Sequence, residues 1–254
     1  MSQKNLSTRS LLELIDLFER SIHAVADGGG QRLHGMPGWE LSRRAALSKR
    51  DLAAWTERIG FAGTYLAASG DECVPVDIEE DDDPGRYRYR CPETFRTKYV
   101  SADLVAVHAV DAVKLLTYLA DLLGVPQAQR SGIMAPTIDG VLWRLGKMRV
   151  ADTQVDAWLV RGLASSTDAV FQHIRIAALP DHGLIFTTGQ PLPDIVVPPR
   201  DYRIVPVASA LVGHALKPHF DIDLIHRLLL APSGSKLEKS LPVRFDRYTK
   251  TLVI

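Results

Sequence analysis

Apolar residues recur every three or four positions in several stretches of the chain, which is the pattern of amphipathic helices. The first stretch predicts a helix over residues 10–26, with Ser10 and Glu13 in the spacing of a capping box. The glycine triplet at 28–30 is expected to end it as a flexible turn. The apolar positions of this helix are Leu11, Leu14, Ile15, Phe18, Ile22 and Val25.

A second capping box, Ser48 with Asp51, introduces a shorter helical pattern that runs through Leu52, Trp55 and Ile59. Together with the first helix, this pattern predicts that residues 1–68 form a largely helical region.

The clearest helical pattern begins at Asp111, whose side chain is a suitable N-cap, and ends at Gly124 and Pro126. Leucines at 115, 116, 119, 122 and 123 form its apolar face. Two further helices are expected, one over 166–178 after a Ser165 and Asp168 box and one over 223–230.

Alternating or continuous apolar runs predict strands at 141–150, 154–161, 184–188 and 202–207. The order helix, hairpin, helix, strand, strand indicates a three-layer α/β domain over residues 101–230, with the later strands parallel. A polar linker at 231–240 and an alternating segment at 243–254 predict a C-terminal hairpin, so residues 231–254 form linker and hairpin. The predicted fold class is mixed α/β.

Charge separates sharply in residues 69–100. Residues 71–83 hold eight acidic and no basic side chains, whereas residues 86–98 hold five basic and one acidic. Asp83, Pro84 and Gly85 form a turn signal between them. The pattern predicts a charged β-hairpin whose two arms partly neutralise each other across the strands.

The composition is that of an ordinary globular protein and excludes wholesale disorder. The chain has 254 residues, of which 46% are hydrophobic and 24% charged, and its 30 basic side chains balance 30 acidic ones. Any binding of nucleic acid must therefore come from a local patch. No secretory signal or membrane span is evident, so a cytoplasmic location without a membrane partner is expected. The oligomeric state stays open.

Cys73 and Cys91 stand beside the two arms of the charged hairpin, and the sequence around Cys91 resembles the second knuckle of a zinc ribbon. A structural zinc site needs four ligands, usually two from each knuckle. This chain supplies one cysteine per knuckle, with Thr94 where the second partner would stand. The resemblance implies a ribbon-shaped hairpin without metal; a zinc-bound ribbon and an unrelated hairpin remain alternatives.

The alternating run Arg86, Tyr87, Arg88, Tyr89, Arg90 is the best candidate for nucleic-acid binding. A strand places alternate residues on opposite faces, so three guanidinium groups would share one face and two rings the other. Arginine suits phosphate contacts and aromatic rings can stack on bases. The alternative is that the arginines pair with residues 77–83 while the tyrosines pack inward.

Residues 111–207 resemble, in their order of elements, the PD-(D/E)xK nuclease fold, whose core runs helix, three-strand meander, helix, strand. The family binds Mg²⁺ through an upstream aspartate and an acidic residue two positions before a lysine. Here Asp139 matches the upstream aspartate, but Leu159 stands in place of the acid and Arg161 in place of the lysine. Asp156 lies on the same strand, although its side chain should face the side of Trp158 rather than that of Leu159.

Other catalytic patterns are missing: the sequence has no paired metal-binding histidines, nucleophile elbow or phosphate-loop lysine. Thr187, Thr188 and Gly189 follow a strand expected to be parallel, where open α/β sheets bind ligands, so they form a candidate ligand site. A simple turn would use the same residues.

These observations favour a non-catalytic module that binds nucleic acid or a protein partner, without cofactor or metal. The alternative from a different class is an enzyme, a divergent Mg²⁺-dependent nuclease that uses Asp139, Asp156 and Arg161.

Overall fold

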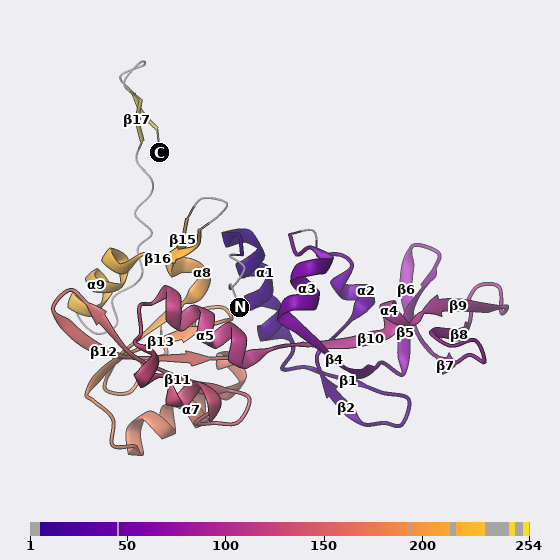
Figure 1. Cartoon of the computed structure of the whole chain (residues 1–254), viewed down its shortest axis with the longest axis horizontal. Coiled ribbons are helices and arrows are strands. Elements are labelled where there is room, and N and C mark those ends of the chain that lie inside the picture. Colours follow the sequence, from indigo (N-terminus) through magenta and orange to yellow (C-terminus); the bar gives the residue numbers. More distant parts are fainter. Residues whose placement is uncertain are drawn as a thin grey trace.

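The computed structural model describes residues 6–44, 46–193, 195–213 and 217–231, together with the backbone of 244–246 and 251–253. It confirms the mixed α/β class, with helices and several separate sheets. The molecule is elongated, with a sheet of four strands and its helices at one end and a group of short strands at the other (Figure 1).

The main sheet has the order β11-β12-β13-β14. Strands β11 (Leu142–Val150) and β12 (Thr153–Val160) form an antiparallel hairpin. Helix α7 (Leu163–Ile176) then connects β12 to β13 (His182–Thr187), which is parallel to β12 and to β14 (Asp201–Pro206). The predicted hairpin and parallel later strands are confirmed, but two antiparallel strands precede α7 where the nuclease core has three.

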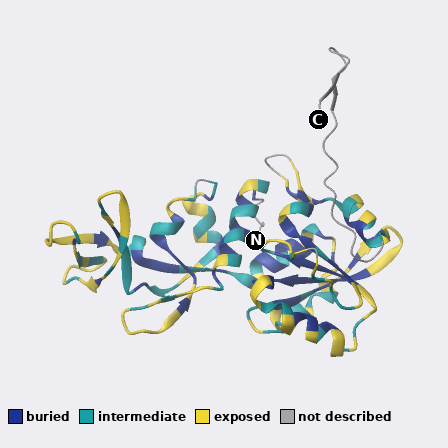
Figure 2. Ribbon diagram, turned by 180° about the vertical axis from the view of Figure 1, so that it is seen from behind, coloured by how far each residue is buried: buried dark blue, intermediate teal, exposed yellow. Residues whose placement is uncertain are grey.

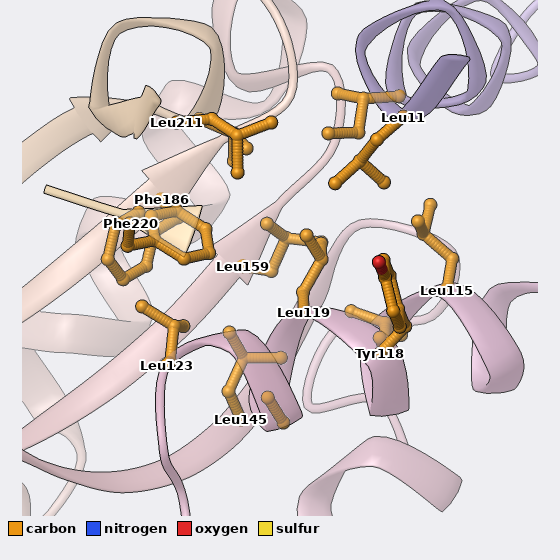
Figure 3. Close-up of a cluster of buried hydrophobic side chains, with 14 of the residues drawn as sticks. Leu11, Leu115, Tyr118, Leu119, Leu123, Leu145, Leu159, Phe186, Leu211 and Phe220 are labelled. Carbon is orange, nitrogen blue, oxygen red and sulfur yellow. The ribbon is translucent and has the colours of Figure 1, made fainter. Parts of the chain in front are cut away.

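Both faces of this sheet are covered, which gives the predicted three layers. On one face, side chains of β11–β14 pack against α1 (Thr8–Arg20), α5 (Ala112–Leu122) and α9 (Ile222–Leu230) in the largest core (Figure 3). Leu159, Phe186 and Leu145 come from the sheet, and Leu119 and Leu11 from the helices. On the other face, Trp158, Val160 and Tyr202 pack against α7 in a second core. Asp156 shares the side of Trp158, as predicted from strand alternation, and both are buried.

Helix α1 (Thr8–Arg20) forms where the apolar stripe predicted it but ends six residues early. The cap is the Ser7 side chain, which accepts a hydrogen bond from the Ser10 backbone N–H at 3.0 Å, so the predicted Ser10 box is wrong. The glycine triplet does not end the helix. It lies in the turn between β1 (Ala24–Ala26) and β2 (Arg32–His34), where Gly30 has φ of 84°.

The prediction of a largely helical region over residues 1–68 is wrong, because much of this region forms strands. Helix α3 (Lys49–Trp55) confirms the Ser48 and Asp51 box, but the chain turns at Trp55 into β4 (Thr56–Phe61). Strand β4 pairs with β10 (Ala106–Val110), which also pairs with β3 (Met36–Pro37). These partners are distant in sequence, and pairing with them overrides the local helical pattern at Ile59.

Residues 64–101 form a strand-rich extension at the end of the molecule away from the main sheet (Figure 1). Strand β5 (Thr64–Ser69) pairs with β6 (Glu72–Asp77), and β7 (Glu79–Glu80) pairs with β8 (Arg86–Arg90), which pairs with β9 (Thr97–Ser101). The acidic run is therefore divided between two sheets. Only its last part faces the basic strand, which corrects the simple two-armed hairpin.

Helix α5 (Ala112–Leu122) confirms its prediction in detail. The Asp111 carboxylate accepts a hydrogen bond from the Lys114 backbone N–H at 3.0 Å. Gly124 takes φ of 67°, a left-handed conformation that costs other residues more. Leu115, Leu116 and Leu119 are completely buried.

Helix α7 begins three residues earlier than predicted, after Gly162. Gly162 has φ of 63°, a left-handed conformation that favours glycine, and a Cβ there would lie 2.3 Å from Ile22 Cδ1, so the Ile22 side chain would have to move. Ser165 does not act as the N-cap; its hydroxyl donates to the Gly162 carbonyl at 2.9 Å.

The remaining elements are short and connect or flank the sheets. Helix α9 confirms the last predicted helix, capped by the Asp221 side chain. The elements are α2 (Gly38–Leu41), α4 (Ala102–Val105), η1 (Gln127–Gln129), α6 (Ser131–Met134), α8 (Val207–Ala210), β15 (Leu211–Val212), β16 (His219–Phe220) and α9 (Ile222–Leu230).

At the C-terminal end, β17 (Arg244–Asp246) and β18 (Thr251–Val253) pair antiparallel, as the alternating pattern predicted. Most of the predicted linker, residues 232–240, lies outside the described residues. Within the part of the chain that the structure describes, no helix combines the length and apolar character that a bilayer span requires.

Candidate functional site

Strand β8 sorts its side chains as the alternation predicted. Tyr87 and Tyr89 point inward and pack in a small core with Ile78 and Val100. The Tyr87 ring centroid lies 5.5 Å from that of Phe61, and the Tyr89 centroid lies 5.5 Å from that of Tyr65. The two tyrosines therefore anchor the strand, and the arginines occupy its outer side.

Two of the three arginines form ion pairs with the last part of the acidic run. Arg86 donates from Nε to Asp81 at 2.6 Å, and its terminal nitrogen lies 2.6 Å from Asp83. Arg88 donates to Glu79 at 3.0 Å. These hydrogen bonds and charges raise the pKa of both arginines, so both are permanently charged.

The ion pairs differ in their exposure. The Asp81 side chain is only 9% exposed, whereas those of Glu79 and Asp83 are 73% and 70% exposed. Exposed pairs contribute little to folding because water already solvates both charges. Asp81 is thus the shielded partner of Arg86, whereas Glu79 and Asp83 form solvent-exposed ion pairs.

Strand β9 and the turn before it add two aromatic rings to the same outer side. Tyr99 pairs in register with Arg88 and is 53% exposed, and Phe95 is 68% exposed. The Arg86 guanidinium carbon lies 4.2 Å from the Tyr99 ring centroid, and that of Arg90 lies 5.8 Å from the Phe95 centroid. We call the surface formed by Arg86, Arg88, Arg90, Phe95 and Tyr99 the arginine face.

Tyr99 and Phe95 were missed in the sequence analysis, which weighed only the tyrosines of β8. The available signal was the alternation of residues 97–101, in which Val100 is the buried type and Tyr99, one position away from it, shares the opposite strand face with Thr97 and Ser101. Figure 2 shows this end of the molecule largely coloured as exposed or intermediate.

The predicted knuckle forms a tight turn after β8. The Cys91 backbone N–H donates to the Arg96 carbonyl and the Phe95 N–H donates to the Cys91 carbonyl, both at 2.9 Å. The Thr94 hydroxyl, aided by backbone N–H groups and Lys98, lowers the pKa of the buried Cys91 thiol to about 7. Cys73 is exposed, and the described residues contain no cluster of three potential ligands. That the two cysteines hold no metal stays a prediction.

A second polar cluster lies where β12 and β13 end. The Glu19 carboxylate, from α1, accepts hydrogen bonds from the Gly162 backbone N–H at 2.8 Å and from the Thr188 hydroxyl at 2.5 Å. Arg161 donates to the Gly140 carbonyl at 2.8 Å and to the Ser21 hydroxyl at 3.1 Å. Burial lowers the pKa of Arg161, although the charges of Glu19 and Asp139 oppose this. Glu19 was not among the predicted site residues.

Thr187, Thr188 and Gly189 lie in this cluster, but their polar groups already have partners. Thr187 is buried and its hydroxyl accepts a hydrogen bond from the Gly189 N–H at 3.3 Å. Thr188 donates to Glu19, as above. A Cβ at Gly189 would lie 2.4 Å from a Glu19 oxygen, so α1 approaches the backbone closely here. These contacts match the turn alternative more closely than an open ligand site.

The structure brings Arg161 near Asp139 but does not bring Asp156 to them. Asp156 is buried on the side of β12 opposite to Leu159, where Arg144 donates to it at 2.5 Å and 3.0 Å. It also lies five residues along the strand from Arg161, roughly 16 Å at the usual rise. Leu159, in the position of the family's acid, is fully buried in the core.

This arrangement does not fit the magnesium site that the nuclease resemblance implies. Mg²⁺ requires several oxygen ligands at about 2.0–2.1 Å, and the Asp156 carboxylate is buried and paired with Arg144. The Glu19 carboxylate, which interacts electrostatically with Arg161, already accepts hydrogen bonds from the Gly162 N–H and the Thr188 hydroxyl.

Comparison with protein-family models, with curated proteins and with solved structures finds no match to this chain.

Proposed function

We propose that this chain is a non-catalytic nucleic-acid-binding module whose arginine face contacts the phosphate backbone. The observation that carries the proposal is the row of guanidinium groups held on the outer side of a strand whose inner side is anchored by half-buried tyrosines. A rigid strand spaces its charges, and arginine forms bidentate contacts with phosphate oxygens.

The acidic neighbours of the arginine face do not block this contact. Glu79 and Asp83 are the exposed members of their ion pairs, at 73% and 70%, and hold their partners weakly. A phosphate can replace them, because binding to a polyanion also releases condensed counterions. Arg90 has no ion pair within 4.0 Å among the described residues and meets only the Phe95 ring, so it is immediately accessible.

The test is a titration of binding against salt concentration. We expect wild-type protein to bind nucleic acid with an affinity that falls as salt rises. The triple variant Arg86→Ala, Arg88→Ala, Arg90→Ala should flatten this dependence by about 0.7 to 0.9 log unit per lost contact. The control variant removes the exposed Arg9, Arg43 and Arg149, which loses the same charge elsewhere. It should leave the slope nearly unchanged.

The competing explanation is that the arginines only balance the acidic run. It predicts that the triple variant melts at a lower temperature while any nucleic-acid affinity stays intact, so thermal melts belong beside the titrations. If wild-type protein shows no salt-sensitive binding to single- or double-stranded DNA or RNA, the proposal is wrong. A protein partner is then the better assignment for this surface.

The alternative of a divergent nuclease has one observation in its favour. Arg161 takes the place of the family's lysine and interacts electrostatically with both Asp139 and Glu19. The missing metal ligands argue more strongly against a nuclease than the position of Arg161 argues for one. Leu159 supplies no oxygen, and Asp156 is paired with Arg144. Incubation of DNA with the protein and Mg²⁺ or Mn²⁺ tests the alternative, and we expect no cleavage.

A further inference from the structure

The arginine face carries an aromatic component that backbone contacts leave unexplained. Among the described residues, the large hydrophobic side chains that are exposed include two aromatic rings, Phe95 at 68% and Tyr99 at 53%. Both lie on this one surface, each next to a guanidinium group. None of the other exposed large hydrophobic side chains in the described part carries a ring.

Other aromatic rings of this extension pack inward. Tyr87 and Tyr89 on β8 are in contact with Phe61 and Tyr65. Val100, which neighbours Tyr99 on β9, also faces inward and is buried. The exposure of Tyr99 therefore follows from strand alternation at a place where the chain puts an aromatic residue on the solvent side.

The arrangement of rings and charges points to one class of ligand. Every base has a flat aromatic face that stacks on a side-chain ring, but in a duplex these faces are covered by neighbouring bases. A strand surface that offers both guanidinium groups and rings can hold the backbone and the bases of the same single strand. A duplex would use the arginines and offer the rings no base face to stack on.

We propose that the arginine face binds single-stranded nucleic acid, with bases stacked on Tyr99 and Phe95 and phosphates held by Arg88 and Arg90. The inference rests on the proposed nucleic-acid binding and deepens it. In register, Arg88 stands opposite Tyr99 across the β8–β9 pair, and Arg90 stands over the Phe95 ring. Each ring thus has a phosphate-binding group beside it, as successive nucleotides of one strand require.

The experiment compares fluorescence anisotropy titrations of a labelled single-stranded oligonucleotide and the matching duplex, with DNA and RNA forms of each. Wild-type protein should prefer the single strand. Tyr99→Ala and Phe95→Ala should each weaken single-strand binding by about fivefold or more and leave duplex binding nearly unchanged. Tyr99→Phe keeps the ring and should retain wild-type affinity. Ile176→Ala, which removes a 75% exposed side chain on α7, is the control and should change neither.

The outcomes separate this inference from the proposal on which it rests. Equal affinity for both forms, with the two alanine variants unchanged, overturns the stacking inference and leaves backbone binding intact. No binding of wild-type protein to any strand overturns both and assigns the surface to a protein partner. Because both rings are exposed, the variants should melt like wild-type protein, and a melt of each variant verifies this.

Discussion

The arginines of this chain serve two different purposes, and burial decides which. The Arg161 guanidinium carbon lies 4.8 Å from the Phe18 ring centroid and 5.8 Å from that of Trp143, and burial lowers its pKa. Its donors are used by Gly140 and Ser21, so it joins α1 to the end of β12. Arg88 is instead solvated and held by an exposed carboxylate. An exposed arginine such as Arg88 can contact a ligand without first breaking buried contacts, whereas Arg161 cannot.

Cys91 gives a prediction at the same scale. Its thiol has a pKa of about 7 in the folded protein because the Thr94 hydroxyl and nearby N–H groups stabilise the thiolate. The pKa of cysteine in an unfolded chain is roughly 8.5, so between these two pKa values the unfolded state binds more protons than the folded state. Stability should therefore rise with pH from about 7 to roughly 8.5 and lose this contribution as pH falls below 7. Chemical denaturation at several pH values measures it.

The variant Cys91→Ser removes the titrating group and should lose this rise in stability. Cys73→Ser is the matched control, since Cys73 is exposed. It should keep the rise. If the free energy of unfolding changes with pH equally in wild-type protein and in Cys91→Ser, the turn does not stabilise the thiolate.

At the scale of elements, local signals predicted those segments whose ends and apolar faces are set by nearby residues. Helix α5 has its cap at Asp111, its stop at Gly124 and its apolar stripe within one continuous segment. The β11–β12 hairpin likewise closes on itself. Strand β4 was missed because its partner, β10, lies about fifty residues away, and local spacing at Trp55 and Ile59 continued the helical pattern.

Helix α5 supports a stability prediction. Leu119 is completely buried in the main core, and Figure 3 shows it between Leu159 and Tyr118. Leu119→Ala should cost about 2 to 5 kcal/mol, because the cavity adds to the lost transfer free energy. Val113→Ala on the same helix is the control; Val113 is 38% exposed and its loss should cost well under about 1 kcal/mol. Equal losses in urea titrations would mean that Leu119 does not face the core.

The contact of α1 with the strand ends supports a second prediction at this scale. The Glu19 carboxylate accepts from both the Thr188 hydroxyl and the Gly162 N–H, so Glu19→Ala should destabilise the fold by about 1–3 kcal/mol. In a double-mutant cycle with Thr188→Val, the two losses should fall short of additivity by about 0.5 kcal/mol or more. With Thr56→Val, which removes a hydroxyl that donates to the Leu52 carbonyl of α3, they should add. Additivity in both cycles would show that the hydrogen bond between Glu19 and Thr188 contributes nothing to stability.

At the scale of the whole molecule, the two candidate surfaces belong to different parts of the fold. The arginine face lies on the strand-rich extension, whereas the Glu19 and Arg161 cluster lies where α1 meets the main sheet (Figure 1). Sequence periodicity identified the arginines and the sheet order, because alternation is a local property. It could not identify Glu19, whose partners at 162 and 188 are 143 and 169 positions away. Long-range contacts of this kind leave no spacing signal.

The separation of Asp139, Asp156 and Leu159 leads to the last prediction, which concerns metal binding by the whole chain. A competent site at a hundredfold excess of Mg²⁺ over its Kd would stabilise the folded state by about 2.7 kcal/mol. For a chain of this size, that gain raises the melting temperature by about 5–10 °C. Since Asp156 is committed to Arg144 and Leu159 is buried, we expect Mg²⁺ and Mn²⁺ to change it by less than about 1 °C. Thermal melts with each ion and with a chelator measure this directly, and Asp139→Asn should behave like wild-type protein. A clear rise that Asp139→Asn abolishes would instead place an ion near Arg161, and the nuclease alternative would then outweigh the binding module.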